Sequence, residues 1–370
     1  MNYLFVFGNS PLLAKEELTS VLARNNIAYQ EISFHDHYQI LECETLPIDI
    51  FKLLGGTVKV AEVFDSPIAT KLTEGIQPKS RVVFGLSGEG TMAQNKEIKD
   101  ELEELGFKAR FVLPKRGESE LSSVVVTKQM VQEVYFLGET SAKTVWVQDF
   151  EDWGKRDYGR PAAAGHVGML PPKVARMMAN IGSREQGIGN KGKYTILDPF
   201  CGVGTILAEG LMIGVDVVGS DSNAQQVAKS KKNLEWLARA YNLEPSRFSV
   251  SLADARSVGI KISPNSVDAV VTEPDLGPTS ISKSQFSISS DKLLLLYTAC
   301  LENWKKILKP NGKVVMVIPS FISGVDEDKS LVKILVDKAQ IMGYSVLAGP
   351  FSYYRSQAVV RRNIIVFLKE

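Results

Sequence analysis

The sequence predicts an α/β protein in which an open, doubly wound parallel sheet follows two small α+β units. Near-continuous Val/Ile strands alternate with helical patterns after residue 165, and two strand–helix–strand patterns occur before residue 150. A stretch rich in Gly, Pro and charge, with little periodicity, lies between them. We therefore expect units at residues 1–66 and 67–150, a linker at 151–165 and a larger domain at 166–370.

The first two units follow from short alternating patterns. A strand, a helix and two strands, the order of a small ferredoxin-like unit, are expected in turn at residues 3–8, 11–26, 29–36 and 38–44. A second set begins with a strand at 81–88, a helix that ends at Gly106 and a strand at 108–114. We expect a helix over 119–139 and a closing strand over 144–150.

The larger domain shows strands and helices in regular alternation. Strands are expected at 193–198, 215–221, 248–254, 267–274 and 312–319, with helices at 205–214, 223–242 and 291–310. Two late strands, at 343–349 and 363–370, finish the chain. Buried parallel strands separated by helices predict a sheet that is covered on both faces.

Composition narrows the class of protein. Lys plus Arg is 43 and Asp plus Glu is 42 in 370 residues, so the whole chain is nearly neutral. Residues 1–150 carry 15 basic and 21 acidic side chains, which leaves 28 and 21 for the remainder. A nucleic-acid footprint must therefore be a local patch. Three scattered cysteines favour neither a disulfide framework nor zinc, and His35 and His37 are expected at a solvent-facing strand end rather than on a metal.

The chain start indicates no export. The first residues carry no basic leader, and the longest apolar runs are far shorter than a bilayer span. We expect a cytoplasmic protein.

Acidic residues close three successive strands of the larger domain. Asp198 precedes a turn that contains Gly202 and Gly204, and Thr205 then begins a helix. Asp221 follows Asp198 by 23 residues, a spacing that suits ribose hydroxyls, and Asp254 closes the next strand. Each acid alone is typical of a loop or a helix cap, and a Gly-x-Gly turn alone is weak evidence. Together they indicate a ligand site, since ligands bind at this edge of such sheets.

Two kinds of ligand are typical of this edge of such a sheet, a dinucleotide and S-adenosylmethionine. A dinucleotide fold needs a third glycine after Gly204, and none stands at the expected place. Asp198 would also repel a pyrophosphate. A ligand with an ammonium, a sulfonium, a ribose and an adenine matches the acids better, and that ligand is S-adenosylmethionine.

The fourth strand leads into a loop with its own carboxylates. Glu273 and Asp275 flank Pro274, and Pro278 follows. These carboxylates could accept hydrogen bonds from an exocyclic amine and so direct its lone pair toward a methyl carbon. The alternative is a turn whose acids have no particular task.

These motifs resemble the THUMP-domain RNA guanine-N2 methyltransferases, the archaeal and eukaryotic tRNA enzymes in particular. The resemblance rests on residues 198–210, 219–221, 253–255 and 272–274, and on separate blocks at 105–126, 156–181 and 353–365. It implies a ferredoxin-like domain, a THUMP domain that holds tRNA and a Rossmann-like methyltransferase domain with a reversed last hairpin. It also implies transfer of methyl to the N2 amine of a tRNA guanosine, of the position 10 type, with a small activating protein as a further expected partner.

The resemblance also assigns residues. It places S-adenosylmethionine against Asp198, Pro199, Gly202, Gly204, Thr205, Asp221, Asp254 and Ala255, and the reactive amine against Glu273, Pro274 and Asp275. Glu209, in the helix after the glycine turn, is either part of the site or exposed.

The reactive motif departs from the family pattern of Asp or Asn, two prolines and an aromatic. Here Glu273 is one methylene longer, Asp275 replaces a stiffening proline and Leu276 replaces the aromatic. Base–aromatic stacking contributes about 1–3 kcal/mol per base, so Leu276 predicts weaker capture of a flipped base.

Basic residues suggest where RNA binds, although a solvated face explains any one cluster equally well. The expected RNA contacts are Lys108, Arg110, Lys115, Arg116, Arg156 and Arg160. Further basic residues near the boundary and in the last strands are Lys155, Lys173, Arg176, Arg355, Arg361 and Arg362.

We thus expect a tRNA guanosine-N2 methyltransferase that uses S-adenosylmethionine and no metal. One alternative is a catalytically impaired RNA-binding or partner protein that keeps the cofactor fold, and the altered motif at Glu273–Leu276 favours it. The other alternative is an amino-methyltransferase that acts on ribosomal RNA or DNA.

Overall fold

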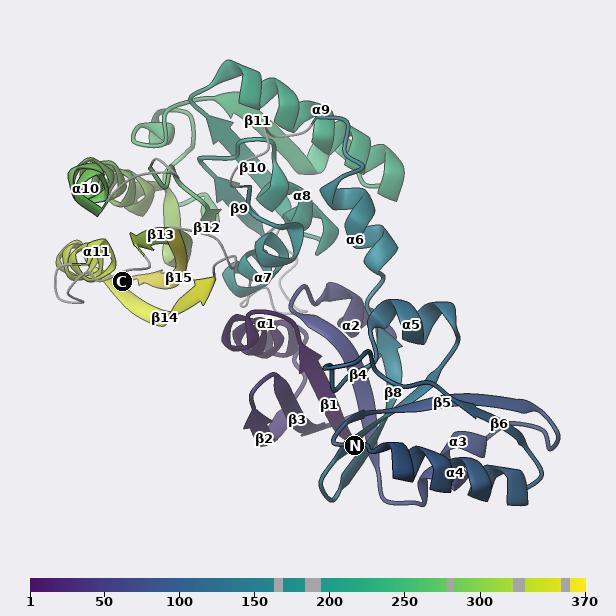
Figure 1. Cartoon of the computed structure of the whole chain (residues 1–370). Coiled ribbons are helices and arrows are strands. Elements are labelled where there is room, and N and C mark those ends of the chain that lie inside the picture. The colour runs from purple at the N-terminus through teal and green to yellow at the C-terminus, as the bar shows by residue number, and fades with distance from the viewer. Residues whose placement is uncertain (163–168, 184–193, 278–282, 322–329, 354–359) are drawn as a thin grey trace. The chain divides into compact units, whose positions relative to one another are not determined.

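The computed structural model describes residues 1–162, 169–183, 194–277, 283–321, 330–353 and 360–370, without the side chains of residues 283–289 and 321. The chain divides into two compact units (Figure 1). The first comprises Met1–Lys15, Ile27–Lys52 and Gly56–Asp152, and the second comprises Glu16–Asn26, Leu53–Gly55 and Trp153–Glu370.

The first unit is built on one eight-stranded sheet in the order β2-β3-β1-β4-β8-β7-β5-β6. The strands are β1 (Asn2–Phe7), β2 (Tyr29–His35), β3 (Tyr38–Cys43), β4 (Thr57–Phe64), β5 (Arg81–Gly88), β6 (Lys108–Phe111), β7 (Gln132–Leu137) and β8 (Thr140–Val147). Neighbouring strands are antiparallel, except that β5 runs parallel to both β6 and β7. The pairing of β4 with β8 joins the two segments that the sequence predicts as separate units.

The helices up to residue 128 are α1 (Pro11–Arg24), α2 (Ile48–Leu53), α3 (Ile68–Thr73), α4 (Met92–Glu104) and α5 (Ser123–Lys128). Thr91 and Gln94 form a capping box at the start of α4. Gly106 has φ +85°, a left-handed conformation that glycine adopts without strain, so the expected helix end is confirmed. Apolar residues of α3 and α4 pack on β5 and β7.

One element of this unit differs from the sequence prediction. The single helix expected over 119–139 is the short helix α5 followed by the strand β7. Val134, Tyr135 and Phe136 favour a strand, and tertiary pairing of β7 with β5 and β8 satisfies that preference. Helical periodicity was therefore the wrong guide in this segment.

A buried ion pair explains why the two predicted units form one body. Lys59 on β4 lies 2.6 Å from Glu133 on β7, and their side chains are 2% and 0% exposed. Glu133 also accepts hydrogen bonds from Ser87 and Thr144. Tyr135 and Tyr38 both donate to Glu120, and so continue the network across the sheet. Because these groups come from both sides of residue 66, separating the segments would leave buried charges without partners.

The second unit carries a seven-stranded sheet in the order β11-β10-β9-β12-β13-β15-β14 (Figure 1). The strands are β9 (Thr195–Asp198), β10 (Asp216–Asp221), β11 (Phe248–Leu252), β12 (Val267–Thr272), β13 (Leu308–Phe321), β14 (Tyr344–Tyr353) and β15 (Val360–Lys369). Strands β9 to β13 are parallel, and β15 lies antiparallel between β13 and β14. The expected Rossmann-like sheet with a reversed last hairpin is confirmed.

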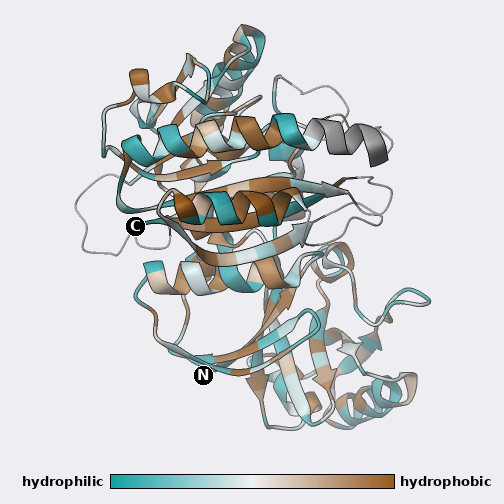
Figure 2. Ribbon diagram, turned by 90° about the vertical axis from the view of Figure 1, so that its left-hand side faces the viewer, coloured by the Kyte–Doolittle hydropathy of each residue, from teal (hydrophilic) through white to brown (hydrophobic). Residues whose placement is uncertain are grey.

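Helices cover both faces of this sheet. The helices that the structure describes from residue 150 onward are α6 (Phe150–Asp157), α7 (Pro172–Gly182), α8 (Thr205–Met212), α9 (Ala224–Tyr241), α10 (Lys283–Ile307) and α11 (Leu331–Ile341). Figure 1 shows α7, α8 and α9 on one face and α10 and α11 on the other. Apolar residues concentrate in the strands between these layers (Figure 2). No helix in the described part of the chain is both long and apolar enough to cross a bilayer.

The segment expected as a linker at 151–165 begins inside a helix. Asp149 accepts hydrogen bonds from the backbone amides of Glu151 and Asp152 and so caps α6. Acidic side chains in its first turn and basic ones in its last turn complement the helix dipole. These local signals outweigh the aperiodic pattern that predicted a linker.

We expect Glu133→Ala to lower the free energy of unfolding by about 3–5 kcal/mol, because Lys59 would remain buried without its partner. Urea denaturation of the full chain measures the change. The double variant Lys59→Met/Glu133→Leu should recover most of the loss, since it removes both charges.

Lys15→Met is the matched control, because the Lys15–Glu31 pair is 30% and 41% exposed and should contribute at most about 1 kcal/mol. A loss in Glu133→Ala no larger than in this control would contradict the structural role of the buried pair.

Candidate functional site

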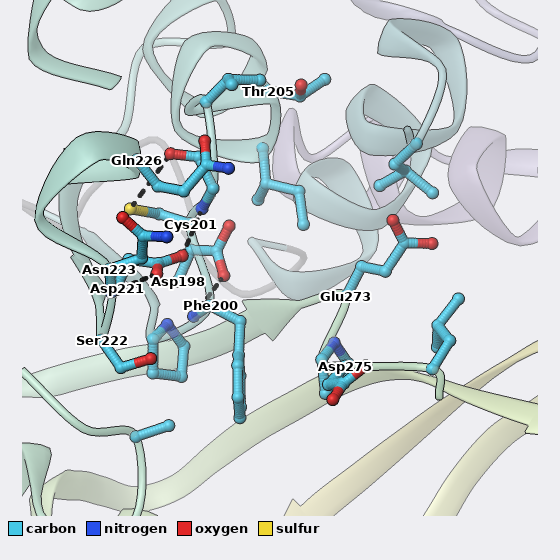
Figure 3. A pocket seen from close by; sticks show the side chains of 18 of the residues that line it. Asp198, Phe200, Cys201, Thr205, Asp221, Ser222, Asn223, Gln226, Glu273 and Asp275 are labelled. Carbon is cyan, nitrogen blue, oxygen red and sulfur yellow. Dashed lines mark hydrogen bonds between the residues drawn. The ribbon is translucent and has the colours of Figure 1, made fainter. Parts of the chain in front are cut away.

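A cavity of about 800 Å³ opens at the carboxyl ends of the parallel strands in the second unit. The predicted residues Asp198, Pro199, Gly202, Thr205, Asp221, Asp254, Ala255, Glu273, Pro274, Asp275 and Leu276 all line it. Gly204 lies in the turn behind them. Figure 3 shows the residues that follow β9 and β10 grouped on one side of the cavity and those that follow β12 on the other. The sheet therefore gathers the predicted cofactor and reactive residues into one crevice.

The turn after β9 depends on its glycines. Gly204 has φ +86° and begins α8, and a Cβ there would lie 2.6 Å from the Ser230 hydroxyl. Gly202 has φ +50° with open space where a Cβ would stand. A side chain at Gly204 would displace α9, whereas Gly202 leaves the backbone open to a ligand. The two glycines therefore serve different purposes: Gly204 avoids a clash with Ser230, and Gly202 leaves open space beside the backbone.

Asp198 is fully buried at the end of β9. It accepts hydrogen bonds from the Thr272 hydroxyl at 2.7 Å and from the Phe200 amide at 3.1 Å. Burial raises the pKa of Asp198 to about 7, and the nearby Asp221 and Glu273 add to the increase, while the two hydrogen bonds oppose it. A cation in the crevice would favour the ionised form of Asp198.

Asp221 is held in one orientation by the backbone. One carboxylate oxygen accepts from the Gly202 amide at 2.9 Å and the other from the Asn223 amide at 2.8 Å. This fixes the carboxylate between the glycine turn and the start of α9. An acid so placed is suited to accept hydrogen bonds from a pair of hydroxyls, as the sequence predicts.

Asp254 and Ala255 lie in the loop after β11. The carboxylate of Asp254 pairs with the Arg256 guanidinium at 2.5 Å, and this contact lowers the pKa of Asp254. The Ala255 carbonyl accepts from the Trp304 indole at 3.1 Å. The sequence analysis did not identify Arg256 as a partner of Asp254. A ligand contact with this carboxylate would have to compete with the arginine.

The loop after β12 is held by partners on other elements. Glu273 pairs with Arg362 on β15 at 2.5 Å, and the Tyr297 hydroxyl on α10 donates to the Asp275 carbonyl at 2.5 Å. The Asp275 side chain accepts from the Gly277 amide at 3.0 Å. The stiffness that a second proline would give is therefore supplied by contacts from β15 and α10. Pro278 lies outside the described residues.

The side chains of Arg156 and Arg160, two of the residues expected to bind RNA, are buried. Arg156 and Arg176 both pair with Glu209, which is 1% exposed, at 2.9 Å and 2.6 Å. Arg160 donates to the Thr205 hydroxyl at 2.9 Å. The burial of Arg156 and Arg160 contradicts the prediction that they contact RNA phosphates, because their guanidiniums bind Glu209 and Thr205 inside the protein. Glu209 is a structural anion and is not exposed.

The other predicted basic residues differ in exposure and location. Lys108 and Arg110 on β6, with Lys115 and Arg116 in the loop that follows, are all exposed in the first unit. Lys173 is partly buried, and burial lowers its pKa to about 8. Arg362 belongs to the crevice, and Arg355 lies outside the described residues.

Sequence reasoning missed several residues that line the crevice. Ser222, Asn223 and Gln226 follow Asp221 directly and lie at the start of α9. Their position just after a predicted acidic strand end was the signal that could have found them. Arg256 follows Asp254 in the same way, so the same signal applies to it, whereas Arg362 had no comparable local signal.

Comparison with known proteins supports this assignment of the fold. Residues 162–326 match the family of RMKL-like methyltransferase domains (UPF0020). The chain is similar to proteins named tRNA (guanine(10)-N2)-dimethyltransferase from Methanothermobacter thermautotrophicus (35% identity over 45% of this chain and 44% of the relative) and Methanocaldococcus jannaschii (30% over 48% and 45%). The chain thus spans about half the length of these curated relatives.

A solved structure covers the entire chain. The crystal structure of TrmN from Thermus thermophilus aligns over 100% of both chains with a TM-score of 0.55 and 16% identity, which supports the fold alone. The second unit therefore has a Rossmann-like fold. The match of residues 162–326 to a methyltransferase domain supports S-adenosylmethionine as the cofactor of the crevice. The acids at the ends of β9 and β10 fit a cationic ligand with ribose hydroxyls.

We expect the affinity for S-adenosylmethionine to rise about tenfold between pH 6 and pH 8. Asp198 has a pKa of about 7, and its ionised form, which is the form that attracts a sulfonium, becomes the majority over this interval. Calorimetry at several pH values measures the affinity, and Asp198→Asn should remove the trend.

The same shift affects stability with the opposite sign. Because the folded pKa lies above the usual value, ionisation of Asp198 destabilises the protein without ligand as the pH rises from about 4 to about 7. Asp198→Asn should therefore be at least as stable as the parent at pH 8. The control Asp268→Asn, at a carboxylate that pairs with Lys309 and does not line the crevice, should keep the pH trend in affinity. Loss of the trend in this control would remove Asp198 as its cause.

Proposed function

We propose that this chain transfers a methyl group from S-adenosylmethionine to the exocyclic N2 amine of a guanosine in tRNA. The observation that carries the proposal is that Glu273 lines the same crevice as Asp198 and Asp221. An acceptor for an amine thus lies across one cavity from acids suited to a cationic adenosine ligand (Figure 3). The similarity to tRNA (guanine(10)-N2)-dimethyltransferases supports the choice of base and amine.

The cofactor side of the crevice would be formed by the turn after β9 and the end of β10. When bound, S-adenosylmethionine supplies a methyl group on a positively charged sulfur. Asp221, fixed by the Gly202 and Asn223 amides, is assigned to the ribose hydroxyls. Asp198 supplies negative charge for the cationic end. The position of Gly202 allows close backbone approach.

The substrate side would be formed by the loop after β12. Glu273 and the Pro274 carbonyl are assigned as acceptors for the two N–H bonds of the amine. Hydrogen bonds from both N–H groups direct the nitrogen lone pair away from these acceptors, and such positioning is the main contribution expected from these residues. As the nitrogen forms its bond to the methyl carbon, the carbon–sulfur bond breaks with its electron pair left on sulfur, and the amine then releases one proton to solvent. Leu276 lines the crevice and offers apolar contact to a base without a π-face.

The RNA would be held by the exposed basic residues of the first unit. That unit is acidic as a whole, so the group of Lys108, Arg110, Lys115 and Arg116 is a local positive patch. Residues 108 and 110 alternate along β6 and so lie on one face of the sheet edge. We propose that this segment is the THUMP contact with tRNA, in an enzyme that works in the cytoplasm.

A rival function is RNA binding without catalysis. Leu276, in place of the family aromatic, is the observation that favours it. The anchoring of the loop by Arg362 and Tyr297 weighs against it, because the loop keeps a fixed form without the second proline.

We expect Glu273→Ala to lower the rate of methyl transfer to tRNA at least about 100-fold while the affinity for S-adenosylmethionine changes less than about twofold. Asp221→Ala should instead abolish cofactor binding. Transfer of labelled methyl to bulk tRNA measures the first effect, calorimetry measures the second, and mass spectrometry of the nucleosides identifies the base.

Cofactor binding without label transfer by the parent protein, with or without a small activating subunit, would favour the RNA-binding rival. Label in ribosomal RNA or DNA but not in tRNA would establish the other alternative. Equal turnover in Glu273→Ala would remove this residue from the mechanism.

We expect the quadruple variant with alanine at Lys108, Arg110, Lys115 and Arg116 to bind tRNA more weakly and with a smaller dependence on salt. Each lost phosphate contact should reduce the slope of log K against log salt by about 0.7–0.9. Filter binding between 50 and 300 mM salt measures it.

The matched control replaces the exposed Lys96 and the half-buried Lys99, which pairs with Glu103, on α4 of the same unit, and should leave the slope unchanged. An unchanged slope in the quadruple variant as well would place the RNA contact elsewhere.

A further inference from the structure

Arg362 connects the far side of the sheet to the reactive loop. It lies on β15, where it pairs with Pro319 of β13, and β13 separates β15 from β12 in the sheet. Its side chain therefore spans β13 to reach Glu273, which follows the last residue of β12. The Arg362 Nε donates to Glu273 Oε1 at 2.5 Å.

The pair lies inside the crevice and is shielded from water. The side chains of Glu273 and Arg362 are 16% and 9% exposed, and both line the cavity. Contacts of this kind between a guanidinium and a carboxylate are short, directional and roughly twice as strong as neutral hydrogen bonds. The orientation of Glu273 is thus set by a residue 89 positions away in the chain.

The charges around Glu273 show why such a partner is needed. Asp198, from the end of β9, and Asp275, on the same loop, are both acidic, and Glu273 contributes to the raised pKa values of Asp198 and of Tyr297 on α10. Among the described residues that line the cavity, five are acidic, and only Arg256 and Arg362 are basic. Arg256 is paired with Asp254, so Arg362 is the cation that balances the reactive side.

The length of the side chain gives a second reason. A glutamate has one more rotatable bond than the aspartate or asparagine of the resembled family, so its carboxylate has more orientations to lose on ordering. A rigid guanidinium removes that freedom, whereas a point charge such as a lysine would do so less well. In Figure 3 the carboxylates of Glu273 and Asp275 point in different directions from the loop, so Asp275 does not duplicate this arrangement.

We propose that Arg362 is a positioning residue for methyl transfer, which holds Glu273 in the single orientation that accepts a hydrogen bond from the substrate amine. This inference rests on the proposed function. Stability alone is a weak explanation for the pair, because a partly buried ion pair often contributes little compared with apolar residues of the same volume.

The test is a cycle of variants in the full-length chain with bulk tRNA and labelled S-adenosylmethionine. Arg362→Gln should lower kcat by about 10–100-fold with KM for tRNA changed less than about twofold, because the lost term is orientation in the reacting complex. Arg362→Lys should restore part of the rate, since it returns the charge without the planar geometry.

The decisive comparison uses Glu273→Gln as the background. If Arg362 acts through Glu273, adding Arg362→Gln to Glu273→Gln should change kcat by less than about twofold. The control Arg247→Gln removes a similar pair with Asp216, at the opposite end of β10, and should leave kcat unchanged. Equal losses from Arg362→Gln in both backgrounds would overturn the proposal.

A second measurement separates this inference from the proposed function. Hydrogen exchange of residues 268–277 should increase in Arg362→Gln and not in Arg247→Gln, whatever the substrate is. If the parent transfers no methyl group, the proposed function fails, and unchanged exchange would then also overturn the role of Arg362 in holding the loop. If exchange increases in Arg362→Gln but the parent transfers no methyl group, the ion pair orders the loop without any methyl transfer for it to support. That outcome also overturns the positioning role.

Discussion

The hydrogen bond from Thr272 to Asp198 joins the two sides of the crevice. Thr272 ends β12 and Asp198 ends β9, and these strands are neighbours in the sheet. The contact therefore fixes the start of the reactive loop against the start of the glycine turn. Asp198 lies among other acids with its pKa raised to about 7, so this buried carboxyl links the position of the loop to the charge of the ligand. Asp198 therefore affects both the position of the loop and the charge of the crevice.

Arginine side chains neutralise several acidic groups of the second unit. Arg362 and Arg256 pair with acids of the crevice, and Arg156 and Arg176 enclose Glu209 on α8. Guanidiniums suit these places because they stay charged when buried and bind carboxylates in fixed geometry. Basic residues that a linear reading assigns to RNA thus stabilise the domain, and the RNA proposal rests on exposed residues of the first unit.

Much of the site followed from the sequence, because its residues lie at the ends of parallel strands. Asp198, Asp221 and Glu273 could be placed together by topology, since parallel strands end at one edge. Arg362 could not, because its strand reverses and its side chain spans β13. Glu209 was equally hidden, as nothing nearby in the chain shows that two arginines enclose it.

The fold was predictable to a similar degree. The order of the second sheet follows from Val/Ile strands that alternate with helices. The single sheet of the first unit did not follow, because the Lys59–Glu133 pair joins segments on either side of residue 66. Residues 119–139 were misread because β7 gains its form from pairing with β5 and β8 and not from local periodicity.

The Tyr297 hydroxyl that anchors the Asp275 carbonyl has a consequence for how such loops are recognised from sequence. A loop pinned from an adjacent helix keeps its form through a backbone atom, and every residue type carries that atom. The conformation of the loop then does not require a proline at position 275, and another residue type can occupy it. A sequence motif that requires two consecutive prolines would miss a chain with this loop. A tyrosine at the position of Tyr297, in the helix that follows the loop, would identify it.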